Sequence, residues 1–419
     1  MLFLRGGHKN AKCGPEDVHA HLESIQLVSL PSTVLTSYLC PNIPHWLKPC
    51  SGESMNVHVI ISTLSGTGMA KNFYQYILQP FLVQIGLVDY KVHETKSAQT
   101  IIRLCKSQFI PVAQSGVPQL LILLSGDGGL SDIVDTFHSA TAALLAPPTI
   151  ALIPAGTGNA MASSMQLNSH ISSGLVTLLR GRPKLVPTFI AAFSPGAQHI
   201  TEEGHSRTSI LGNSRQEGDC PKIRGAVVVS WGMHAALVAD SDTTEYRRFG
   251  SDRFKMAANE LLFPSNGTET HKYAGTITLT KWDRQTDSRY METVSNKEHM
   301  YVLATLLPRL EKDFMISPKS KPLDGSLWFV HFGPMPPEQA MQLMTHAYCG
   351  GQHVGEEGVF YSEIEGFKIE FNEIDERWRR VCIDGKIVVV ENGGWMEVRK
   401  EVKHAVNILA PPGIDDIRH

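Results

Sequence analysis

Two runs of apolar residues, each ended abruptly by a glycine-rich turn, most constrain what this chain can fold into. The first spans residues 119–124 and is followed by Ser125-Gly-Asp-Gly-Gly129; the second spans 149–153 and is followed by Pro154-Ala-Gly-Thr-Gly-Asn159. Short apolar runs that stop at glycine are typical of strands buried on both faces, so we predict two central strands of a parallel sheet. Glycine turns at such strand ends let backbone N–H groups point into one concavity, which suits the phosphates of a nucleotide.

The length and composition of the chain favour a globular protein of two domains. At 419 residues it exceeds the size of one ordinary hydrophobic core, and its 42% hydrophobic and 19% charged residues are typical of globular proteins. Binding of DNA or RNA normally requires a basic surface. The formal net charge of -3 gives no sign of one, so we expect no nucleic-acid partner.

The cysteines indicate a reducing compartment. The seven cysteines are scattered, with no C-x-x-C pair and no cluster at zinc spacing. The apolar run at the N-terminus is too short for a secretory signal, and no stretch approaches the roughly 20 apolar residues that cross a bilayer. We therefore expect a cytoplasmic protein that associates with membranes only peripherally.

Strands and helices alternate through the first half of the chain. The alternation predicts a doubly wound α/β nucleotide-binding domain over residues 55–183, whose ligand lies beyond the carboxyl ends of the strands. Residues 1–54 precede it as a lead-in for which the pattern indicates no structure. The expected strands span 57–61, 88–93, 119–124 and 149–153, and the expected helices span 70–85, 97–107 (capped by Ser97) and 132–145.

The second half has many strand-like runs and few helical ones, which predicts a β-sandwich-like domain over residues 184–400. Within it, about 194–222 is rich in Gly, Ser, Glu, Arg and His, and we expect a flexible insertion there. Residues 401–419 are the expected C-terminal tail. The strand-like runs are 184–193, 226–231, 274–280, 300–307, 327–331, 359–371, 380–383 and 387–390, and the helical ones are about 252–262 and 337–348.

A third glycine turn, Ser65-Gly-Thr-Gly68, lies between the strand at 57–61 and the helix that follows. One such turn is a weak signal, but three after three strands of one sheet are much less expected by chance. None of them is a Walker loop. Asp127, the carboxylate of the 125–129 turn, suits contact with Mg²⁺ or acceptance of a proton from an attacking hydroxyl; the alternative is an ordinary turn aspartate.

Taken in order, these motifs resemble the diacylglycerol kinase catalytic superfamily, and within it the sphingosine (sphingoid long-chain base) kinases. The resemblance spans roughly 56–398. In the first half it is carried by Ser65-Gly-Thr-Gly-Met-Ala70, His93-Glu-Thr95, Ser125-Gly-Asp-Gly128 and Pro154-Ala-Gly-Thr-Gly-Asn-Ala160. In the second half it is carried by Ser230-Trp-Gly232, Ala239-Asp-Ser-Asp242, Tyr246-Arg-Arg-Phe-Gly250, Arg253-Phe254 and Ile383-Asp-Gly385.

The resemblance implies a lipid kinase that uses ATP and Mg²⁺, with the active site in the cleft between the α/β domain and a β-sandwich lipid-binding domain. Asp127 would be the catalytic carboxylate, and no residue is assigned as a metal ligand. Arg247 and Arg253 would reach the phosphates from the second domain. The expected nucleotide-binding residues are Ser65, Gly66, Gly68, Thr95, Ser125, Gly126, Gly128, Gly156, Thr157, Gly158, Asn159, Arg247, Arg253, Asp384 and Gly385.

The resemblance also assigns the polar head of the lipid to Asp242, with Asp240 as the second choice. A sphingoid base carries an ammonium group, for which a desolvated carboxylate is a favourable partner. The alternative for these two aspartates is a helix N-cap with a surface neighbour. For Arg247 and Arg248 the alternative is a solvated ion pair, which contributes little to stability.

The chain departs from the family pattern at two places. Ser62-Thr63 stands where the family has Asn-Pro before the first glycine turn, which we expect to affect mainly the shape of the loop. Lys386 stands where the family has a glutamate after Asp-Gly, which reverses the local charge and puts metal handling or activity in question.

The sequence therefore predicts a lipid kinase that transfers the γ-phosphate of ATP to a primary hydroxyl, with a sphingoid base as the favoured acceptor. The alternatives are a diacylglycerol or related glycerolipid kinase, and a catalytically weak family member that binds lipid or nucleotide. The expected partners are the lipid substrate and a membrane surface.

Overall fold

The computed structural model describes residues 4–5, 26–27, 56–63, 65–66, 68–210 and 220–416, which divide into two compact units. The first unit contains residues up to Thr157 together with 165–185 and 405–415; the second contains 158–164, 186–404 and Asp416. Of the expected lead-in over 1–54, only the short paired strands β1 (Leu4–Arg5) and β2 (Gln26–Leu27) are described. Among the described helices, none has the length and apolar character needed to cross a bilayer.

The first unit is built on a six-stranded sheet in the order β4-β3-β5-β6-β23-β7. The first five strands are parallel and β7 is antiparallel to β23. The strand order reverses between β3 and β5, and in open α/β sheets ligands bind outside the carboxyl ends of the strands at such a reversal. The strands are β3 (Asn56–Ile61), β4 (Lys91–Glu94), β5 (Gln119–Ser125), β6 (Thr149–Pro154), β7 (Arg182–Leu185) and β23 (Asn407–Ala410).

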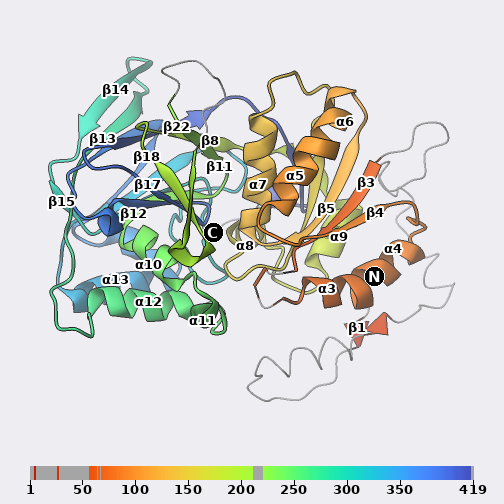
Figure 1. The fold of residues 1–419 in the computed structure, drawn as a ribbon, viewed down its shortest axis with the longest axis horizontal. Coiled ribbons are helices and arrows are strands. Elements are labelled where there is room, and N and C mark those ends of the chain that lie inside the picture. Colours follow the sequence, from red (N-terminus) through yellow and green to blue (C-terminus); the bar gives the residue numbers. More distant parts are fainter. Residues whose placement is uncertain are drawn as a thin grey trace. The chain divides into compact units, whose positions relative to one another are not determined.

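Helices cover both faces of this sheet (Figure 1). On one face, side chains of α3, η2, α4 and α9 share an apolar core with alternate residues of β3, β5 and β6. On the other face, the Phe109 ring packs on His58 of β3, with ring centroids 4.8 Å apart. The helical segments are α3 (Ala70–Phe73), η2 (Tyr74–Leu78), α4 (Gln79–Gln84), α5 (Thr100–Leu104), η3 (Cys105–Phe109), α6 (Ile110–Gln114), α7 (Asp127–His138) and α9 (Ser173–Arg180).

Two of these helical segments contain a π-helical turn just before a proline. Residues 70–84 and 100–114 are each helical throughout, and η2 and η3 end one residue before Gln79-Pro80 and Ile110-Pro111, respectively. Proline has no N–H to donate and its ring crowds the carbonyl four residues earlier, so the backbone widens locally instead of breaking. The expected cap at Ser97 is not found, because Gln99 is the N-cap and makes no side-chain capping bond.

Helix α7 begins at Asp127, five residues before the expected start of this helix at 132. Gly128 and Gly129, which the sequence analysis places in a turn, lie in its first turn. A Cβ atom on Gly129 would come within 2.9 Å of the Ser125 Cβ atom, whereas one on Gly128 would meet nothing within 4 Å. Gly129 is therefore a packing requirement, because only a residue without a side chain lets the helix start this close to the end of β5.

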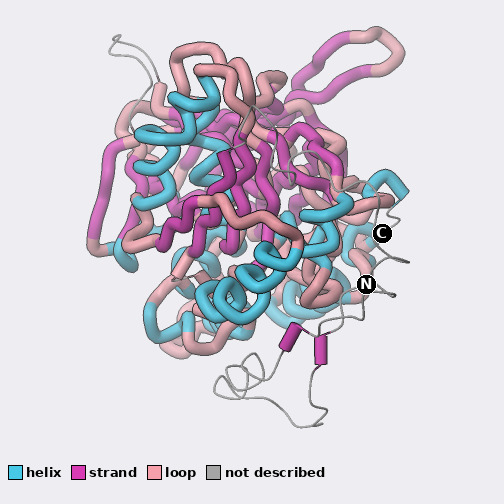
Figure 2. The backbone as a smooth tube through the Cα atoms, turned by 90° about the vertical axis from the view of Figure 1, so that its right-hand side faces the viewer, coloured by secondary structure: helices cyan, strands magenta, loops and turns pink. Residues whose placement is uncertain are grey.

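The second unit contains two antiparallel sheets that enclose one apolar core, in agreement with the expected β-sandwich-like architecture (Figure 2, strands in magenta). The eight-stranded sheet has the order β10-β9-β21-β20-β12-β16-β17-β18, and the seven-stranded sheet β11-β8-β22-β19-β13-β14 has β15 paired to β13 in addition. The eight strands are β9 (Gln198–Thr201), β10 (Ser206–Ser209), β12 (Val228–Gly232), β16 (Tyr301–Thr305), β17 (Leu327–Phe332), β18 (Val359–Ile364), β20 (Arg380–Ile383) and β21 (Lys386–Val389). The others are β8 (Thr188–Phe193), β11 (Lys222–Gly225), β13 (Tyr273–Asp283), β14 (Ser288–Thr293), β15 (Glu298–His299), β19 (Gly366–Phe371) and β22 (Trp395–Glu401).

Four longer helices and several short ones accompany these sheets. Alternate residues of β20 face the core and α10: Val381 and Ile383 lie in the core between the sheets, whereas Cys382 packs with Ala235 of α10. The helices are α8 (Ala160–Ser164), α10 (Met233–Ser241), α11 (Thr244–Arg247), α12 (Asp252–Leu262), α13 (Pro337–Tyr348), and the short 3-10 turns η4 (Glu202–Gly204), η5 (Gln352–Gly355) and η6 (Glu376–Arg379).

Two segments differ from the sequence-based expectation. Residues 198–209 of the expected insertion form the β9–β10 hairpin, which extends the eight-stranded sheet through β21, whereas 211–219 lie outside the described residues. In the expected tail over 401–419, β23 pairs in parallel with β6 and thus completes the sheet of the first unit. Both pairings join segments far apart in the chain.

The turn between β20 and β21 consists of Asp384 and Gly385, with φ angles of 48° and 88°. An Asp-Gly pair with positive φ at both positions is the preferred two-residue hairpin turn. The buried Asp384 carboxylate accepts hydrogen bonds from the backbone N–H groups of Ala226, Val227 and Val228, at 2.7, 3.0 and 2.8 Å. The structure thus gives Asp384 a structural role: it joins the β20–β21 turn to the start of β12.

Replacement of Gly129 by alanine should destabilise the first unit by about 1–3 kcal/mol, because the added methyl group overlaps Ser125. Gly128→Ala is the matched control, since alanine favours a helix and meets no neighbour there. Urea denaturation of the two variants checks this, and equal midpoints would contradict the close packing of α7 on β5.

Asp384→Asn should destabilise the second unit by about 2–4 kcal/mol, because an amide cannot accept three N–H bonds with the strength of a carboxylate. Asp283→Asn is the control: this aspartate also accepts a backbone N–H in a hairpin turn, from Gln285 at 2.8 Å, but it is fully exposed, so its loss should have little effect. Thermal unfolding followed by circular dichroism measures the difference. Similar melting temperatures for both variants would remove the structural role.

Candidate nucleotide and phosphate site

The turns that follow β3, β5 and β6 contact one another at the carboxyl ends of these strands. The Ser62 N–H donates to the Leu124 carbonyl at 2.9 Å, and the Ala155 N–H donates to the Ser125 carbonyl at 3.0 Å. Gly66 has φ of 56°, and a Cβ atom there would lie 2.6 Å from the Ala155 carbonyl oxygen. The first turn therefore packs backbone against backbone on the third, which only glycine permits.

Serine hydroxyls link the first and second turns. The Ser62 and Ser65 hydroxyl oxygens are 2.6 Å apart, and the Ser65 and Ser125 hydroxyl oxygens are 3.4 Å apart. A hydroxyl group can donate as well as accept, so this row can turn its protons toward phosphate oxygens. Ser65 and Ser125 belong to the predicted site, whereas Ser62 was identified only as a departure from the family pattern.

Thr95, also predicted to line the nucleotide, lies at the end of β4 beside the first turn. Its backbone N–H donates to the Ile61 carbonyl at 2.9 Å, and its hydroxyl oxygen accepts the Thr63 N–H at 3.0 Å. The Thr63 hydroxyl in turn donates to the Thr95 carbonyl at 2.8 Å. The structure thus brings the ends of β3 and β4 together with those of β5 and β6.

Asp127 is the first residue of α7, and Gly126 is its extended N-cap residue. The Asp127 side chain is half-buried, and Gly128 beside it is exposed. The first N–H groups of a helix have no partner within the helix and carry partial positive charge, which favours anions at this end. The arrangement of glycine backbone, hydroxyl groups and helix start fits a polyphosphate, with one carboxylate next to it.

The third turn, Ala155–Asn159, is where the chain passes from one unit to the other: Thr157 belongs to the first and Gly158 to the second. Asn159 has φ of 51°, and its carbonyl accepts the Ser163 N–H at 2.7 Å at the start of α8. A Cβ atom on Gly158 would lie 3.2 Å from the Leu310 carbonyl oxygen. The predicted residues Gly156, Thr157, Gly158 and Asn159 are all half-buried.

In the second unit, Asp242 forms ion pairs with both arginines predicted to bind phosphate. Its Oδ1 atom lies 3.0 Å from Arg247 Nη2 and 3.3 Å from Arg253 Nη1. Asp242 follows the last residue of α10, Arg247 ends α11 and Arg253 is the second residue of α12. One carboxylate therefore fixes two cations from different helices.

Arg253 is the more buried of the two arginines, with 13% of its side chain exposed against 46% for Arg247. Burial lowers the pKa of the Arg253 guanidinium, and Asp242 acts in the opposite direction. Burial also raises the pKa of nearby Glu311 to about 7. Asp242 and Glu311 both favour the charged form of Arg253, so the desolvated cation is compensated on two sides.

Asp240 is paired as well. Its carboxylate oxygens lie 2.8 Å from Arg380 Nη2 and 3.1 Å from Arg377 Nη2. The alternative of a helix N-cap at these aspartates is wrong, because Thr243 is the N-cap of α11 and accepts the Tyr246 N–H at 3.2 Å. Neither aspartate is thus poised with an unpaired carboxylate for an ammonium group.

The residues of the predicted Ile383-Asp-Gly385 element lie in the hairpin turn described above. Lys386, which replaces the family's glutamate, begins β21, one residue before Ile387 pairs with Ile200 of β9. Burial and the nearby Lys386 lower the pKa of His199 to about 4, so this histidine is neutral beside the lysine. The assignment of Asp384 and Gly385 to the nucleotide stays a prediction.

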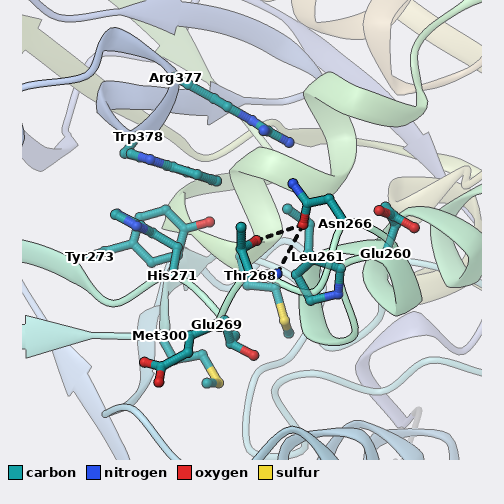
Figure 3. Close-up of a pocket in the computed structure, with 13 residues that line it drawn as sticks. Glu260, Leu261, Asn266, Thr268, Glu269, His271, Tyr273, Met300, Arg377 and Trp378 are labelled. Atoms are coloured by element: carbon teal, nitrogen blue, oxygen red, sulfur yellow. Dashed lines mark hydrogen bonds between the residues drawn. The ribbon is translucent and has the colours of Figure 1, made fainter.

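The second unit also contains a cavity of about 280 Å³ beside the C-terminal end of α12 (Figure 3). Trp378 forms one wall, stacked on His271 with ring centroids 4.0 Å apart, while the Arg377 guanidinium lies 4.6 Å from the centre of the Trp378 ring. A second cavity of about 440 Å³ shares Met300 and Pro264 with it and is lined mainly by apolar and proline side chains. The two cavities offer apolar surface, and much of the polar lining is already paired within the protein: His271 with Glu373, and Thr268 with Asn266.

Among the described residues there is no group of three or more His, Cys, Asp or Glu side chains that could hold a metal ion by themselves. This suits Mg²⁺ in a kinase, which usually binds to one or two carboxylates and to the phosphates of the substrate. The contacts made by Thr63 were not anticipated, because hydroxyl residues after a strand occur in many ordinary turns.

Comparison with known proteins agrees with this geometry. Residues 56–189 match the family model described as the diacylglycerol kinase catalytic domain. The comparison with curated proteins gives no match. Two solved structures of candidate diacylglycerol kinases from Bacillus anthracis str. Sterne are similar to this chain at TM-scores of 0.55, with 15% and 16% identity, and each similarity covers 86% of this chain and 98% of the other. At this identity the similarity shows a shared fold. Residues 56–189, which contain the three contacting glycine turns, are therefore identified as a diacylglycerol kinase catalytic domain.

Proposed function

We propose that this protein is a lipid kinase that transfers the γ-phosphate of ATP to a hydroxyl group of a lipid. The observation that carries the proposal is the contact of the three glycine turns at the strand-order reversal, within the residues that match the diacylglycerol kinase catalytic domain. Such a turn cluster offers backbone N–H groups and a helix start to phosphates. The fold shared with the Bacillus proteins extends the likeness over both halves of the chain.

Each residue type in the site suits one part of phosphoryl transfer. ATP, bound with a divalent cation such as Mg²⁺, supplies the phosphoryl group, and Asp127 is the carboxylate beside which the cation would be held. The backbone of the glycine turns and the hydroxyls of Ser65 and Ser125 would bind and orient the phosphates. Asp127 would accept the proton of the attacking lipid hydroxyl, and Arg247 and Arg253 are proposed to neutralise the charge that develops during transfer.

The acceptor class has two candidates. The motif resemblance favours a sphingoid base, whose ammonium group would bind Asp242, with Asp240 as the second choice. The ion pairs favour a neutral acceptor such as diacylglycerol, because an ammonium group at Asp242 would lie next to two guanidinium groups. We further propose that the protein contacts membranes peripherally, since either acceptor is a membrane lipid.

Purified protein incubated with labelled ATP, Mg²⁺ and a panel of sphingoid bases, diacylglycerol and ceramide should phosphorylate at least one of these lipids. Asp127→Asn should lower kcat by about 10²–10⁴, because loss of a general base typically has this effect. Asp135→Asn, further along α7, is the matched control and should retain activity. Turnover that survives Asp127→Asn would contradict the proposed site. Nucleotide binding without turnover of any lipid would instead favour a regulatory binding protein with Lys386 at its site.

Asp242→Asn distinguishes the two acceptor classes. The ion pairs predict a similar loss of kcat/KM with sphinganine and with its neutral N-acetyl derivative, together with a higher KM for ATP, because the variant releases Arg247 and Arg253. The two lipids differ mainly in the charge on nitrogen, so steady-state kinetics with the pair isolates the ammonium group. A loss confined to sphinganine, at unchanged KM for ATP, would assign Asp242 to the ammonium group and support a sphingoid base kinase.

A further inference from the structure

Thr63 holds Thr95 in two directions at the edge of the sheet. The Thr63 N–H donates to the Thr95 hydroxyl oxygen at 3.0 Å, and the Thr63 hydroxyl donates to the Thr95 carbonyl at 2.8 Å. Together with the bond from the Thr95 N–H to Ile61, these contacts engage the N–H group, the carbonyl and one acceptor site of the Thr95 hydroxyl. We call this pair of Thr63–Thr95 bonds the threonine clasp.

The clasp matters because the strand that carries Thr95 has little else to hold its end. Strand β4 is an edge strand that pairs only with β3, and three of its four residues are exposed. The ion pair between Lys71 and Glu94, at 3.1 Å, is roughly half exposed on both sides and contributes little. The position of Thr95 therefore depends on the strand pairing and on the clasp.

The clasp also fixes the direction in which the Thr95 hydroxyl can act. Its oxygen already accepts the Thr63 N–H, and the Thr63 hydroxyl proton is used in the shorter bond to the Thr95 carbonyl. The two hydroxyl oxygens are 3.4 Å apart, which is long for a hydrogen bond between hydroxyl groups. The Thr95 hydroxyl is thus left as a donor, and it suits a ligand that presents an acceptor oxygen or nitrogen.

We propose that Thr63 is a positioning residue for the nucleotide, which orients the Thr95 hydroxyl as a hydrogen-bond donor toward an acceptor atom of ATP. The inference rests on the proposed kinase function and adds a residue to its site. Threonine is required here because both its N–H and its hydroxyl are used. The proline that the resembling family has at this position could supply neither, so the clasp is a feature of this chain.

The test measures Mg·ATP affinity of the full chain by calorimetry without lipid. Thr63→Val keeps the shape and the N–H but removes the hydroxyl, and it should weaken ATP binding about fivefold, the effect of one lost hydrogen bond. Thr63→Ser keeps the hydroxyl and should bind as the wild type does. Thr95→Val should weaken binding at least as much, and adding Thr63→Val to it should have little further effect, since the oriented donor is already gone.

The outcomes separate positioning from mere support of the fold. Unchanged ATP affinity in Thr63→Val, with or without a lower melting temperature, would overturn the inference. Additive losses in the Thr63→Val/Thr95→Val double variant would overturn it as well, because independent effects do not pass through Thr95. If the wild type itself binds no ATP, the proposed function fails together with the inference. If the wild type binds ATP and phosphorylates lipid while Thr63→Val does so equally well, the inference fails alone.

Discussion

The contact between the backbone of Gly66 and the carbonyl of Ala155 is the constraint on which the candidate site depends. It brings the turn after β3 against the turn after β6, with the turn after β5 joined to both by backbone hydrogen bonds. The in-register pairing of three parallel strands sets the height of these turns, and glycine allows them to meet. A side chain at position 66 would separate them, so the sheet register and the glycine pattern act together.

The second unit contributes a different kind of order, based on paired charge. Both aspartates of the Ala239-Asp-Ser-Asp242 element are held by arginines, and Asp384 is held by backbone N–H groups. A motif names these residues as ligands, but their contacts show that each already has partners within the protein. The arginines near Asp242 are therefore pre-oriented, and the same pairing makes the site less favourable for a cationic lipid head.

Local patterns predicted much of the fold. The helices at 252–262 and 337–348 agree with α12 and α13, because an apolar stripe at helical spacing is visible in the sequence. The start of α7 was missed because Gly128 and Gly129 are poor helix formers, and packing against Ser125 outweighs that preference. Strand β23 was missed because its pairing with β6 joins residues more than 250 positions apart, which no local pattern encodes. The same limit applied to the site: the glycine turns could be found, whereas the ion pairs of Asp242 and the clasp of Thr63 depend on contacts between elements.

Hydrogen–deuterium exchange with and without Mg·ATP tests the central claim most directly. The account predicts slower exchange of the backbone amides in the turns at Ser65–Gly68, Ser125–Gly129 and Ala155–Asn159 when nucleotide is bound, since these N–H groups would face the phosphates. Protection confined to other segments, with these three turns exchanging at the same rate in both states, would contradict it.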